Sequence, residues 1–323
     1  MKALVTGATG FVGGLLAARL REEGDTVVAL VRSPDRARDL VRLGVVTVAG
    51  DLADRPALAT AATGCDIVYH LAGAIAARSE VEFLTVNETG TQAVADAATA
   101  AGIERFVLVS SLAAAGPSEP GVPLRGDEPP RPVSQYGRSK LAGEAVVRRS
   151  SLAWSILRPP AVYGPGDREM FRIFKAVATF GIAPVFGAGG QRLSLVYGPD
   201  LAEALTAVGR SPGAIGQTWY PAHPEVHTSR SLIDAVAQAA GRRARVLSIP
   251  FPVGRGLLWA TDLAARMTGR PTVLTRDKAN ELFQSAWLCD PSPLTQATGW
   301  KAQHDLERGA KATLDWYRQA GWL

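Results

Sequence analysis

The amino-acid sequence predicts an α/β protein with a doubly wound parallel β-sheet and a smaller C-terminal lobe. Three observations predict this fold class. Short apolar runs alternate with helical stretches in the first half of the chain, a glycine-rich turn joins the first run to the first helix, and the regular alternation ends after residue 157. With 323 residues, of which 47% are hydrophobic, the chain is long enough to bury a large core.

Six apolar runs have the length and composition of buried parallel strands. They span residues 2–6, 26–31, 45–49, 66–70, 105–109 and 154–157. Helices are expected over residues 10–23, over a long alanine-rich stretch at 81–101, and from about Gln135 onward. Strands that alternate with helices are joined by crossover connections, so these strands should lie parallel in one sheet.

The regular pattern gives way to a second lobe after the sixth strand. Residues 116–134 are rich in proline, glycine and charge, which predicts a surface excursion before the helix at Gln135. The segment Arg158-Pro159-Pro160 marks the exit from the sheet. We therefore predict a dinucleotide-binding domain over 1–160 and a lobe mainly for substrate over 161–323, from which some segments return to the first domain. Within this lobe, residues 228–240 and 306–317 have helical patterns.

The turn after the first strand has the Gly-x-x-Gly-x-x-Gly pattern of a dinucleotide-binding site. Glycines allow the backbone to approach a pyrophosphate, and the start of the following helix offers unpaired N–H groups and a favourable dipole. An ordinary tight turn is the alternative, which the flanking strand and helix disfavour. The pattern predicts a Rossmann-type nucleotide site that includes Gly7, Thr9, Gly10, Phe11, Val12 and Gly13.

The end of the second strand favours NADP over NAD. NAD-selective sites place a carboxylate there to bond the ribose hydroxyls, whereas this chain has Arg32. A guanidinium can form a forked contact with the 2′-phosphate of NADP, which a carboxylate would repel. The alternative is that Arg32 is an ordinary exposed arginine.

Three side chains are candidates for catalysis. Tyr136 and Lys140 are four residues apart in a helical stretch, so their side chains share one face. A nearby ammonium and the positive nicotinamide ring would stabilise the phenolate of Tyr136 and make it a usable proton donor and acceptor. Ser111, beyond the strand at 105–109, could hydrogen-bond the substrate oxygen.

Taken together, these motifs resemble the extended short-chain dehydrogenases/reductases, the superfamily of nucleotide-sugar epimerases, dihydroflavonol reductases and 3β-hydroxysteroid dehydrogenases. The similarity runs nearly from end to end. The matching pieces are Thr6 to Gly13, Gly50-Asp51-Leu52, His70-Leu71-Ala72-Gly73, Asn87-x-x-Gly90-Thr91, Ser110-Ser111, Tyr136-Gly137-Arg138-Ser139-Lys140 and Arg158-Pro159-Pro160-Ala161-Val162-Tyr163-Gly164-Pro165.

The resemblance implies roles for further residues. It places Asp51 and Leu52 at the adenine, Leu71, Ala72 and Gly73 beside the ribose, and Pro159, Ala161 and Val162 along the nicotinamide. Tyr136 follows Ser111 by 25 residues, the spacing of the family, which selects Ser111 over Ser110 as the catalytic serine. A homodimer is also a family expectation.

Departures from the family pattern narrow the subclass. Leu112 and Ala113 replace the acidic pair of the sugar-nucleotide dehydratases, and Ala115 replaces a tyrosine found in many epimerases. The epimerases' phosphate-binding Arg-Asp-Phe stretch is replaced by residues 193–195, although Arg192 could substitute. The second lobe offers apolar side chains for a pocket, none of which is assigned to substrate; they are Trp219, Tyr220, Phe251, Leu257, Leu258, Trp259, Phe283 and Trp287.

Other classes of site receive little support. His223 and His227 resemble a metal-binding pair only faintly, since Pro224 opposes a helix, and no metal site is expected. His70 is expected to be a hydrogen-bonded structural group. The net charge of +5 comes from dispersed arginines, so no nucleic-acid partner is expected.

The sequence also indicates a cellular compartment. The two cysteines have no paired spacing, and no secretory signal is visible, which favours the cytoplasm. The apolar stretch at 256–265 contains Asp262 and is too short for a bilayer span, which leaves contact with a membrane surface open.

These observations lead to three hypotheses. The first is an NADP-dependent oxidoreductase that interconverts a secondary alcohol and a ketone on a fairly apolar small molecule, with Tyr136 as general acid and base. The second is a nucleotide-sugar epimerase. The third is a non-catalytic NADP-binding sensor or assembly subunit, which the intact Ser111, Tyr136 and Lys140 disfavour.

Overall fold

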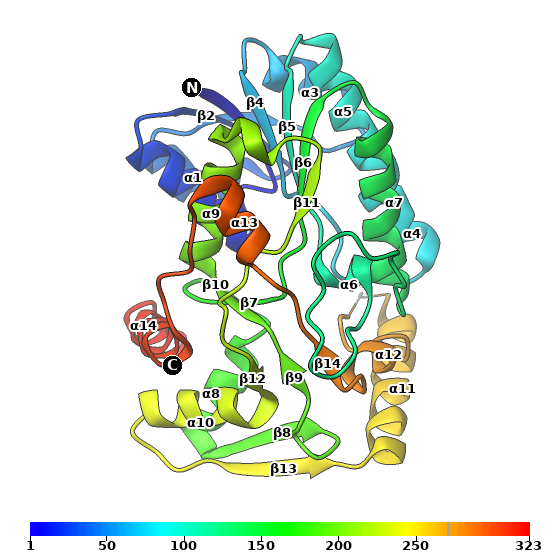
Figure 1. The fold of residues 1–323 in the computed structure, drawn as a ribbon, viewed down its shortest axis with the longest axis vertical. Helices are drawn as coiled ribbons and strands as arrows, with labels where there is room; N and C mark the ends of the chain where they lie inside the picture. Colours follow the sequence, from blue (N-terminus) through cyan, green and yellow to red (C-terminus); the bar gives the residue numbers. More distant parts are fainter. Residues whose placement is uncertain (270–271) are drawn as a thin grey trace.

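A computed structural model describes residues 1–269 and 272–323. Its centre is a seven-stranded sheet in which all neighbouring strands are parallel, in the order β11-β6-β5-β4-β1-β2-β3 (Figure 1). The strands are β1 Lys2–Thr6, β2 Thr26–Val31, β3 Val46–Ala49, β4 Ile67–His70, β5 Arg105–Val109, β6 Ala153–Leu157 and β11 Gln217–Trp219. The predicted fold class is confirmed.

Six of these strands were expected from the sequence. Three have the predicted bounds, β3 and β4 begin one residue later, and β6 begins one residue earlier. Val45 belongs to the preceding turn, where its N–H donates to the carbonyl of Leu40. The seventh strand, β11, was not predicted, because three residues are too few to show a pattern.

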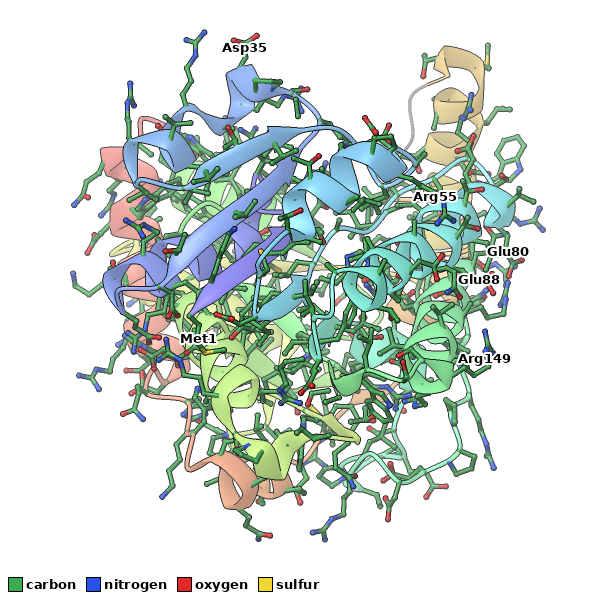
Figure 2. All side chains as sticks on the ribbon, turned by 90° about the horizontal axis from the view of Figure 1, so that it is seen from above. Met1, Asp35, Arg55, Glu80, Glu88 and Arg149 are labelled. Atoms are coloured by element: carbon green, nitrogen blue, oxygen red, sulfur yellow. The ribbon has the colours of Figure 1, made fainter. Side chains whose placement is uncertain are left out.

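Helices cover both faces of the sheet. One face packs against α1 (Phe11–Glu22), α9 (Gly198–Arg210) and α13 (Ser292–Thr298), and the other against α3 (Arg55–Ala62), α5 (Gly90–Ala100) and α7 (Gln135–Arg149). Alternate residues of β1 point to opposite faces, since Ala3 and Val5 belong to the first core and Leu4 to the second. Figure 2 shows the labelled Arg55 and Arg149 at the outer surface of the second helical layer.

Two predicted helices have different bounds. The first was expected over residues 10–23, but Gly10 and Glu23 are the residues that cap α1. The expected helix at 81–101 is divided into α4 (Glu80–Leu84), a π-helical turn over Thr85–Thr89, and α5. The π-helical turn places Asn87 in the interior, where its side chain forms two hydrogen bonds with the backbone of Ala74 in the loop after β4. These bonds accompany the interruption of the regular α-helix.

The segment between β5 and α7 is mostly irregular, as predicted. It contains the short helix α6 (Leu112–Ala115), and residues 116–134 then form no helix or extended strand. The helix α7 begins at Gln135, and the Ser134 hydroxyl caps it by accepting the N–H of Gly137 at 3.0 Å.

The second lobe is built from short strand pairs and helices around its own core. The pairs are β7 (Ala161–Tyr163) with β10 (Leu195–Tyr197), β8 (Ile182–Phe186) with β13 (Arg245–Ile249), and β9 (Arg192–Leu193) with both β12 (His227–Thr228) and β14 (Ala286–Trp287). The helices are α8 (Phe171–Phe180), α10 (Ser229–Ala239), α11 (Phe251–Thr268), α12 (Ala279–Leu282) and α14 (Leu306–Gln319).

Two helices of this lobe were expected. Thr228 caps α10 as predicted, and α14 runs two residues past the predicted end. The division of the chain at residue 160 stays a prediction; α9, α13 and β11 belong to the sheet of the first part. Within the part of the chain that the structure describes, no helix has the length and apolar character needed to cross a bilayer.

Candidate active site

The glycine turn between β1 and α1 is tightly packed. Gly7 has a φ of 77°, and a Cβ there would lie 2.7 Å from the backbone nitrogen of Ala72. A Cβ on Gly13 would lie 2.1 Å from the carbonyl oxygen of Gly7. Larger residues at either position would therefore separate α1 from the sheet or displace the loop after β4.

The start of α1 fits a pyrophosphate group. Gly10 is the N-cap residue and has no side chain to bond the first amides of the helix, so the N–H groups of Phe11 and Val12 stay available. The helix dipole adds positive potential at the same place. Thr9 lies within this turn, so the structure brings together the six predicted residues of the glycine turn.

The loop after β4 borders this turn. The N–H of Leu71 donates to the carbonyl of Thr6 at 3.1 Å, which continues the β1–β4 pairing. Asn87 fixes the next residues, because its amide accepts the N–H of Ala74 at 2.8 Å and donates to the hydroxyl of Ser139 at 2.8 Å. The loop is thereby tied to α7, which holds the candidate catalytic residues.

Lys140 lies between this loop and the end of β5. Its buried ammonium donates to the carbonyl of Val109 at 2.7 Å, and it lies 3.5 Å from the place that a Cβ on Gly73 would occupy. Burial lowers the pKa of Lys140 to about 8, although the carboxylate of Glu144 raises it in part. The charge is therefore close to the predicted ribose site and only just retained at neutral pH.

Tyr136 and Ser111 are brought together as predicted. The Ser111 hydroxyl lies close enough to the phenol to lower the pKa of Tyr136 in part, and the Ser111 oxygen accepts the N–H of Ala113 at 3.1 Å. The ring of Phe83 packs against Tyr136 with centroids 6.0 Å apart. Tyr136 is consequently held in one orientation, with its oxygen at the serine.

The electrostatics of Tyr136 differ from the expectation. Burial raises the pKa of Tyr136 to about 12, the Ser111 hydroxyl lowers it in part, and the carboxylate of Glu281 raises it further. Lys140 was expected to stabilise the phenolate, but its ammonium is bonded to Val109 instead. Without a bound cofactor, Tyr136 is therefore a stable neutral phenol at physiological pH.

A buried ion network supports the catalytic helix. Arg158 donates from two nitrogens to the two carboxylate oxygens of Glu144, at 2.8 and 2.7 Å, and to the Tyr220 hydroxyl at 3.1 Å. Ser110 donates to the same carboxylate at 2.5 Å. Ser110, the neighbour of the predicted catalytic serine, is therefore part of this network. The sequence motifs did not single out Glu144, because a buried acid on a helix has no local signature.

The remaining predicted cofactor residues follow the carboxyl ends of the strands, at the same edge of the sheet as the glycine turn. Arg32 follows β2 and is exposed, and no hydrogen bond or ion pair of its side chain is found among residues 1–269 and 272–323. The carboxylate of Asp51 accepts the N–H groups of Ala53 and Asp54, at 2.8 and 3.1 Å. Leu52 packs against the core beside Gly90.

The segment after β6 contains the last three of the predicted cofactor residues. The carbonyl of Pro159 accepts the N–H of Leu112 at 2.9 Å, which places it next to the start of α6. Ala161 and Val162 belong to β7, where Ala161 is exposed and Val162 is half-buried.

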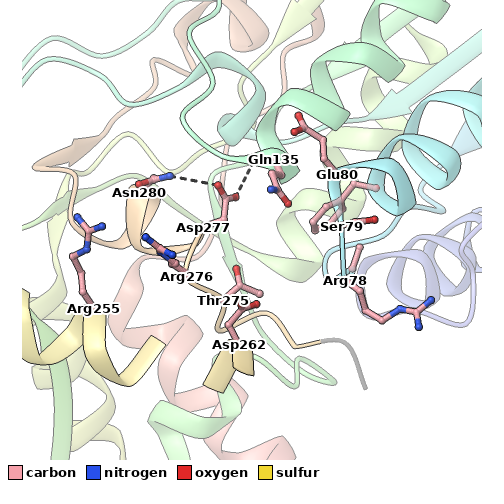
Figure 3. Close-up of a pocket in the computed structure, with 12 residues that line it drawn as sticks. Arg78, Ser79, Glu80, Gln135, Arg255, Asp262, Thr275, Arg276, Asp277 and Asn280 are labelled. Carbon is pink, nitrogen blue, oxygen red and sulfur yellow. Dashed lines mark hydrogen bonds between the residues drawn. The ribbon is translucent and has the colours of Figure 1, made fainter. Parts of the chain in front are cut away.

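A cavity of about 510 Å³ opens next to Tyr136. Figure 3 shows that it lies between the α4 side, with Arg78, Ser79 and Glu80, and the second lobe, with Arg255 and Arg276. Its further lining residues are Ala77, Phe83, Gln135, Asp262, Thr275, Asp277 and Asn280. Tyr136 does not line the cavity itself, but Phe83, which packs against its ring, and Gln135, which precedes it in the chain, do.

The second lobe reaches the catalytic helix at this cavity. Asp277 accepts the N–H of Gln135 at 2.8 Å (Figure 3), and Glu281 accepts a hydrogen bond from the Ser134 hydroxyl. Lys278 pairs with Glu281, and its ammonium lies 5.8 Å from the centroid of the Tyr136 ring. These residues could not be predicted from the sequence, because they belong to no motif and lie about 140 residues from Tyr136.

The eight apolar side chains that the sequence offers for a pocket do not line the cavity beside Tyr136. Trp219, Tyr220 and Leu258 are buried, which agrees with ordinary core packing. Phe251, Leu257 and Trp259 are about half exposed on the outside of α11, and the cavity beside Tyr136 is lined mainly by charged and polar groups. The expectation that these aromatic residues line a pocket is therefore wrong for this cavity.

His70 is a structural group, as predicted. Its two ring nitrogens bond the hydroxyl groups of Thr6 and Thr91, at 2.6 and 3.0 Å. Burial and, to a smaller extent, the charge of Lys140 lower the pKa of His70 to about 3, so the ring stays neutral.

The pair His223 and His227 comes closer together than the sequence suggested. Their ring nitrogens and a carboxylate oxygen of Glu225 all lie within 4.8 Å of one another. The segment before β12 forms no helix and bends at Pro224 and Glu225, so helical spacing is not the criterion that decides whether these side chains meet. This group lies in the second lobe, at the edge of β12 near α10 (Figure 1).

The fold and these residues define a class of protein. A parallel sheet whose first turn fits a pyrophosphate, with a serine, a tyrosine and a lysine at its carboxyl edge, is the arrangement of a nicotinamide-dependent oxidoreductase of Rossmann type.

The comparisons with known proteins give the family. The sequence profile of the NAD dependent epimerase/dehydratase family matches residues 3–219, and the chain belongs to this family. It is an NAD(P)-dependent enzyme of the extended short-chain dehydrogenase/reductase type.

Two relatives and one structure are similar over nearly the whole chain. A ceramide reductase of Caulobacter vibrioides is 36% identical, with 99% of this chain and 95% of the relative covered. A 4-hydroxy-2-methyl-3-oxo-4-farnesyl-3,4-dihydroquinoline-1-oxide ketoreductase of Stigmatella aurantiaca is 30% identical, with 86% and 90% covered. MoeE5, solved with UDP-glucuronic acid and NAD, is 25% identical, with a TM-score of 0.81 and 99% and 100% covered.

Proposed function

We propose that the protein is an NADP-dependent reductase that interconverts a ketone and a secondary alcohol on a largely apolar molecule. The observation that carries the proposal is the pairing of Ser111 with Tyr136 at the end of β5, where the serine hydroxyl acts on the phenol and the ammonium of Lys140 is held by Val109. This arrangement can bind a carbonyl oxygen and give it a proton.

The residues divide the proton chemistry between them. Ser111 orients the substrate oxygen by a hydrogen bond, and Tyr136 donates its phenolic proton to that oxygen as the ketone is reduced. A phenol with a pKa raised to about 12 holds this proton at neutral pH, which suits the direction of reduction. In the reverse direction the phenolate accepts the proton of the alcohol.

Lys140 supports the charge that develops on the phenol. The carbonyl of Val109 orients the ammonium, and the loop Leu71 to Gly73 lies next to it. A bound nicotinamide cofactor supplies or accepts the hydride. The glycine turn, the loop after β4 and residues Pro159 to Val162 are proposed to hold it.

NADP is the proposed cofactor because of Arg32. Its exposed guanidinium has no partner within the described part of the chain, and Asp35, an acid nearby in the sequence, is paired with Arg38. A 2′-phosphate would give this guanidinium a charge-assisted partner.

The names of the relatives support an apolar substrate. One relative is a reductase of ceramide, which is a lipid, and the other reduces a quinoline compound that carries a farnesyl chain. The second name describes reduction of a ketone on a molecule with a long hydrocarbon chain, and the first describes reduction of a lipid. The free, buried cysteines Cys65 and Cys289 agree with a cytoplasmic compartment, which we also propose.

An epimerase is the second candidate, and the similarity to MoeE5 with UDP-glucuronic acid favours it. Arg192, exposed on β9, would have to bind the diphosphate in place of the missing Arg-Asp-Phe stretch. We rank it second because residues 193–195 carry no charge for that contact.

The stoichiometry of the cofactor separates the two candidates. The purified protein is incubated with NADPH and a panel of apolar ketones, and the loss of the reduced nicotinamide is compared with the alcohol formed. The proposal expects one NADPH to be oxidised for each alcohol. Inversion of a UDP-sugar without net oxidation of NADPH would favour the epimerase and overturn the proposal.

A further inference from the structure

The outer face of α11 is apolar along its whole length. A continuous stripe on this helix is formed by the exposed positions 252, 253, 256, 257, 259, 260, 263, 264 and 267, which hold only Pro, Val, Gly, Leu, Trp, Ala or Met. The exposed polar residues Arg255 and Thr268 lie at the edges of this stripe. The larger side chains are well exposed, from 42% for Leu263 to 80% for Met267. An 18-residue helix with such a surface is unusual for a face that meets only water.

The inner face of the same helix accounts for its attachment to the protein. Leu258 is buried, and a Cβ on Gly254 would lie 2.7 Å from the ring of Phe283 and 2.9 Å from that of Phe186. Arg255 and Asp262 line the cavity beside Tyr136. The polar groups therefore turn toward the cavity, and the exposed apolar side chains are not needed for the internal packing.

The region around this face is basic. Residues 241–261 contain Arg242, Arg243, Arg245 and Arg255 and no acidic residue, and Asp262, the next residue of α11, lines the cavity. Arg255 belongs to α11 itself, whereas the other three arginines lie before or at the start of β13 and α11 follows the end of that strand. Residues 170–192, which form α8 and the neighbouring strand β8, also contain only basic charges. The Arg255 guanidinium lies 5.3 Å from the ring centroid of Phe251, at the edge of the apolar face.

We propose that α11 docks the protein on an anionic lipid surface. The helix would lie in the interface with its apolar side chains among the acyl chains, and the arginines would contact phosphate headgroups. Trp259 is an aromatic residue of the kind that favours the headgroup level. Figure 2 shows α11, drawn in pale orange-yellow, standing out from the body of the molecule, so a flat surface can reach it.

A second copy of this chain fits the face less well. A symmetric contact through α11 would bring the Arg255 residues of two copies to the same apolar face, while Asp262, the acid of this helix, lines the cavity. Lipid phosphates supply the opposite charge that a second copy lacks.

The docking surface has a consequence for the substrate, and this step rests on the proposed function. One side of α11 contributes Arg255 and Asp262 to the cavity beside Tyr136, and the opposite side would contact lipid. An apolar ketone dissolved in the membrane would then be concentrated on the far side of the helix that borders this cavity.

Sedimentation with vesicles tests the docking surface without any turnover. The full chain is mixed with vesicles of phosphatidylcholine and phosphatidylglycerol in equal parts, and the test variant carries both Trp259→Gln and Leu263→Gln. The wild type should pellet with these vesicles, less so in high salt and with pure phosphatidylcholine, and the variant should lose most of its bound fraction. A matched control with Val41→Gln and Leu43→Gln, two exposed apolar residues of the first part of the chain, should bind like the wild type.

Size-exclusion chromatography with light scattering and thermal unfolding accompany the assay. Both variants should unfold like the wild type, because the changed side chains are exposed. If the wild type stayed in the supernatant, or if the variant still pelleted, the lipid surface would be excluded. A dimer that only the α11 variant dissociates, without vesicle binding, would assign the face to a second copy instead.

Measuring the rate of ketone reduction tests separately whether the substrate arrives from the membrane. Reduction of a short, water-soluble ketone should be unchanged in the α11 variant, whereas reduction of a long-chain ketone held in vesicles should fall. Loss of activity on both ketones, or on neither, would contradict the route. Failure of the proposed reaction itself would appear as inactivity of the wild type on every ketone, whatever its binding to vesicles.

Discussion

At the scale of single residues, the site separates the proton donor from the charge that supports it. Tyr136 lies beside Ser111 and holds its proton, while Lys140 is bonded to a backbone carbonyl and has its pKa lowered to about 8. Burial acts on both groups, and in each it favours the neutral form. The two groups therefore predict a particular dependence of the reaction on pH.

We expect kcat/KM for ketone reduction to fall above about pH 8, by up to tenfold per pH unit. Tyr136 stays protonated in this range, so the loss comes from Lys140, which is charged below its pKa and neutral above it. The measurement is a pH profile of the wild type and of Lys140→Arg, in which the guanidinium keeps its charge. The residual activity of the arginine variant should lack this decline, and an unchanged decline would mean that another group titrates.

Arg32 gives a test of cofactor choice. Arg32→Asp should weaken the binding of NADPH by about tenfold or more and leave the binding of NADH unchanged or tighter, because the 2′-phosphate would lose its cationic partner and meet a carboxylate. Calorimetric titration with both cofactors measures this. Arg149→Asp, at an exposed site at the end of α7, is the control and should leave both affinities alone. Equal weakening of both cofactors would contradict the NADP assignment.

His70 makes the stability of the protein depend on pH. Its pKa is lowered from 6.5 to about 3, so between these values the unfolded chain binds a proton that the folded chain does not. The free energy of unfolding should then fall as the pH drops, by up to about 1.4 kcal/mol per pH unit. Urea unfolding at several pH values tests this, with His70→Gln expected to have a flatter dependence. The same slope in both proteins would place the effect elsewhere.

At the scale of elements, one carboxylate joins three parts of the sheet edge. Glu144 on α7 is bonded to Arg158 after β6 and to Ser110 after β5, and Arg158 in turn contacts Tyr220 after β11. These bonds fix α7, and with it Tyr136 and Lys140, over the carboxyl ends of the strands.

Removing the negative charge of Glu144 should lower the free energy of unfolding. Glu144→Gln leaves the buried guanidinium of Arg158 without its counter-charge, and we expect a loss of about 3–5 kcal/mol in the free energy of unfolding. Glu119→Gln, at an exposed position, should change the stability by less than about 0.5 kcal/mol. Denaturant unfolding compares the two variants. A small loss for Glu144→Gln would mean that solvent or another group replaces the carboxylate.

The elements of the first part were predictable for a physical reason. Strands such as β1, β2 and β5 are buried on both faces, so they are continuous apolar runs between polar turns, and their ends could be predicted to the residue. The π-helical turn at Asn87 could not be, because its cause is a contact with Ala74 on another loop. The strands of the second lobe pair residues far apart in the chain, such as Arg245 with Ile182, and short pairs of this kind leave no local pattern.

The residues of the site that belong to sequence motifs were predicted, whereas the residues outside these motifs were missed. Ser111, Tyr136 and Lys140 lie together as expected, because residue spacing on a helix and strand ends of a parallel sheet are fixed by regular geometry. Asp277 and Glu281 were missed, since their contacts with the start of α7 depend on how the second lobe folds back. The same limit hid the apolar outer face of α11, whose residues looked like core.

At the scale of the whole molecule, the two parts are interleaved. The helix α9 covers α1 and the sheet, and β11 adds a strand beyond β6, although both follow residue 160. Leu16 and Leu20 on α1 share a core with Leu201 and Leu205 on α9.

A fragment of residues 1–160 should therefore not form a native fold. It would expose the apolar face that α9 covers and would leave Arg158 without Tyr220. Circular dichroism and amide NMR of this fragment, beside the full chain, measure the outcome. A cooperative unfolding transition with dispersed NMR signals would show that residue 160 is a true domain boundary.

The most direct test of the proposed reaction is the removal of the phenolic hydroxyl group of Tyr136. Tyr136→Phe should lower kcat for NADPH-dependent ketone reduction by roughly 100-fold or more, because the proton donor is lost, while the affinity for NADPH is retained. Tyr69→Phe, in the core of β4, is the matched control and should keep near-normal turnover. Turnover of Tyr136→Phe close to that of the wild type would contradict the assignment of this phenol as the general acid.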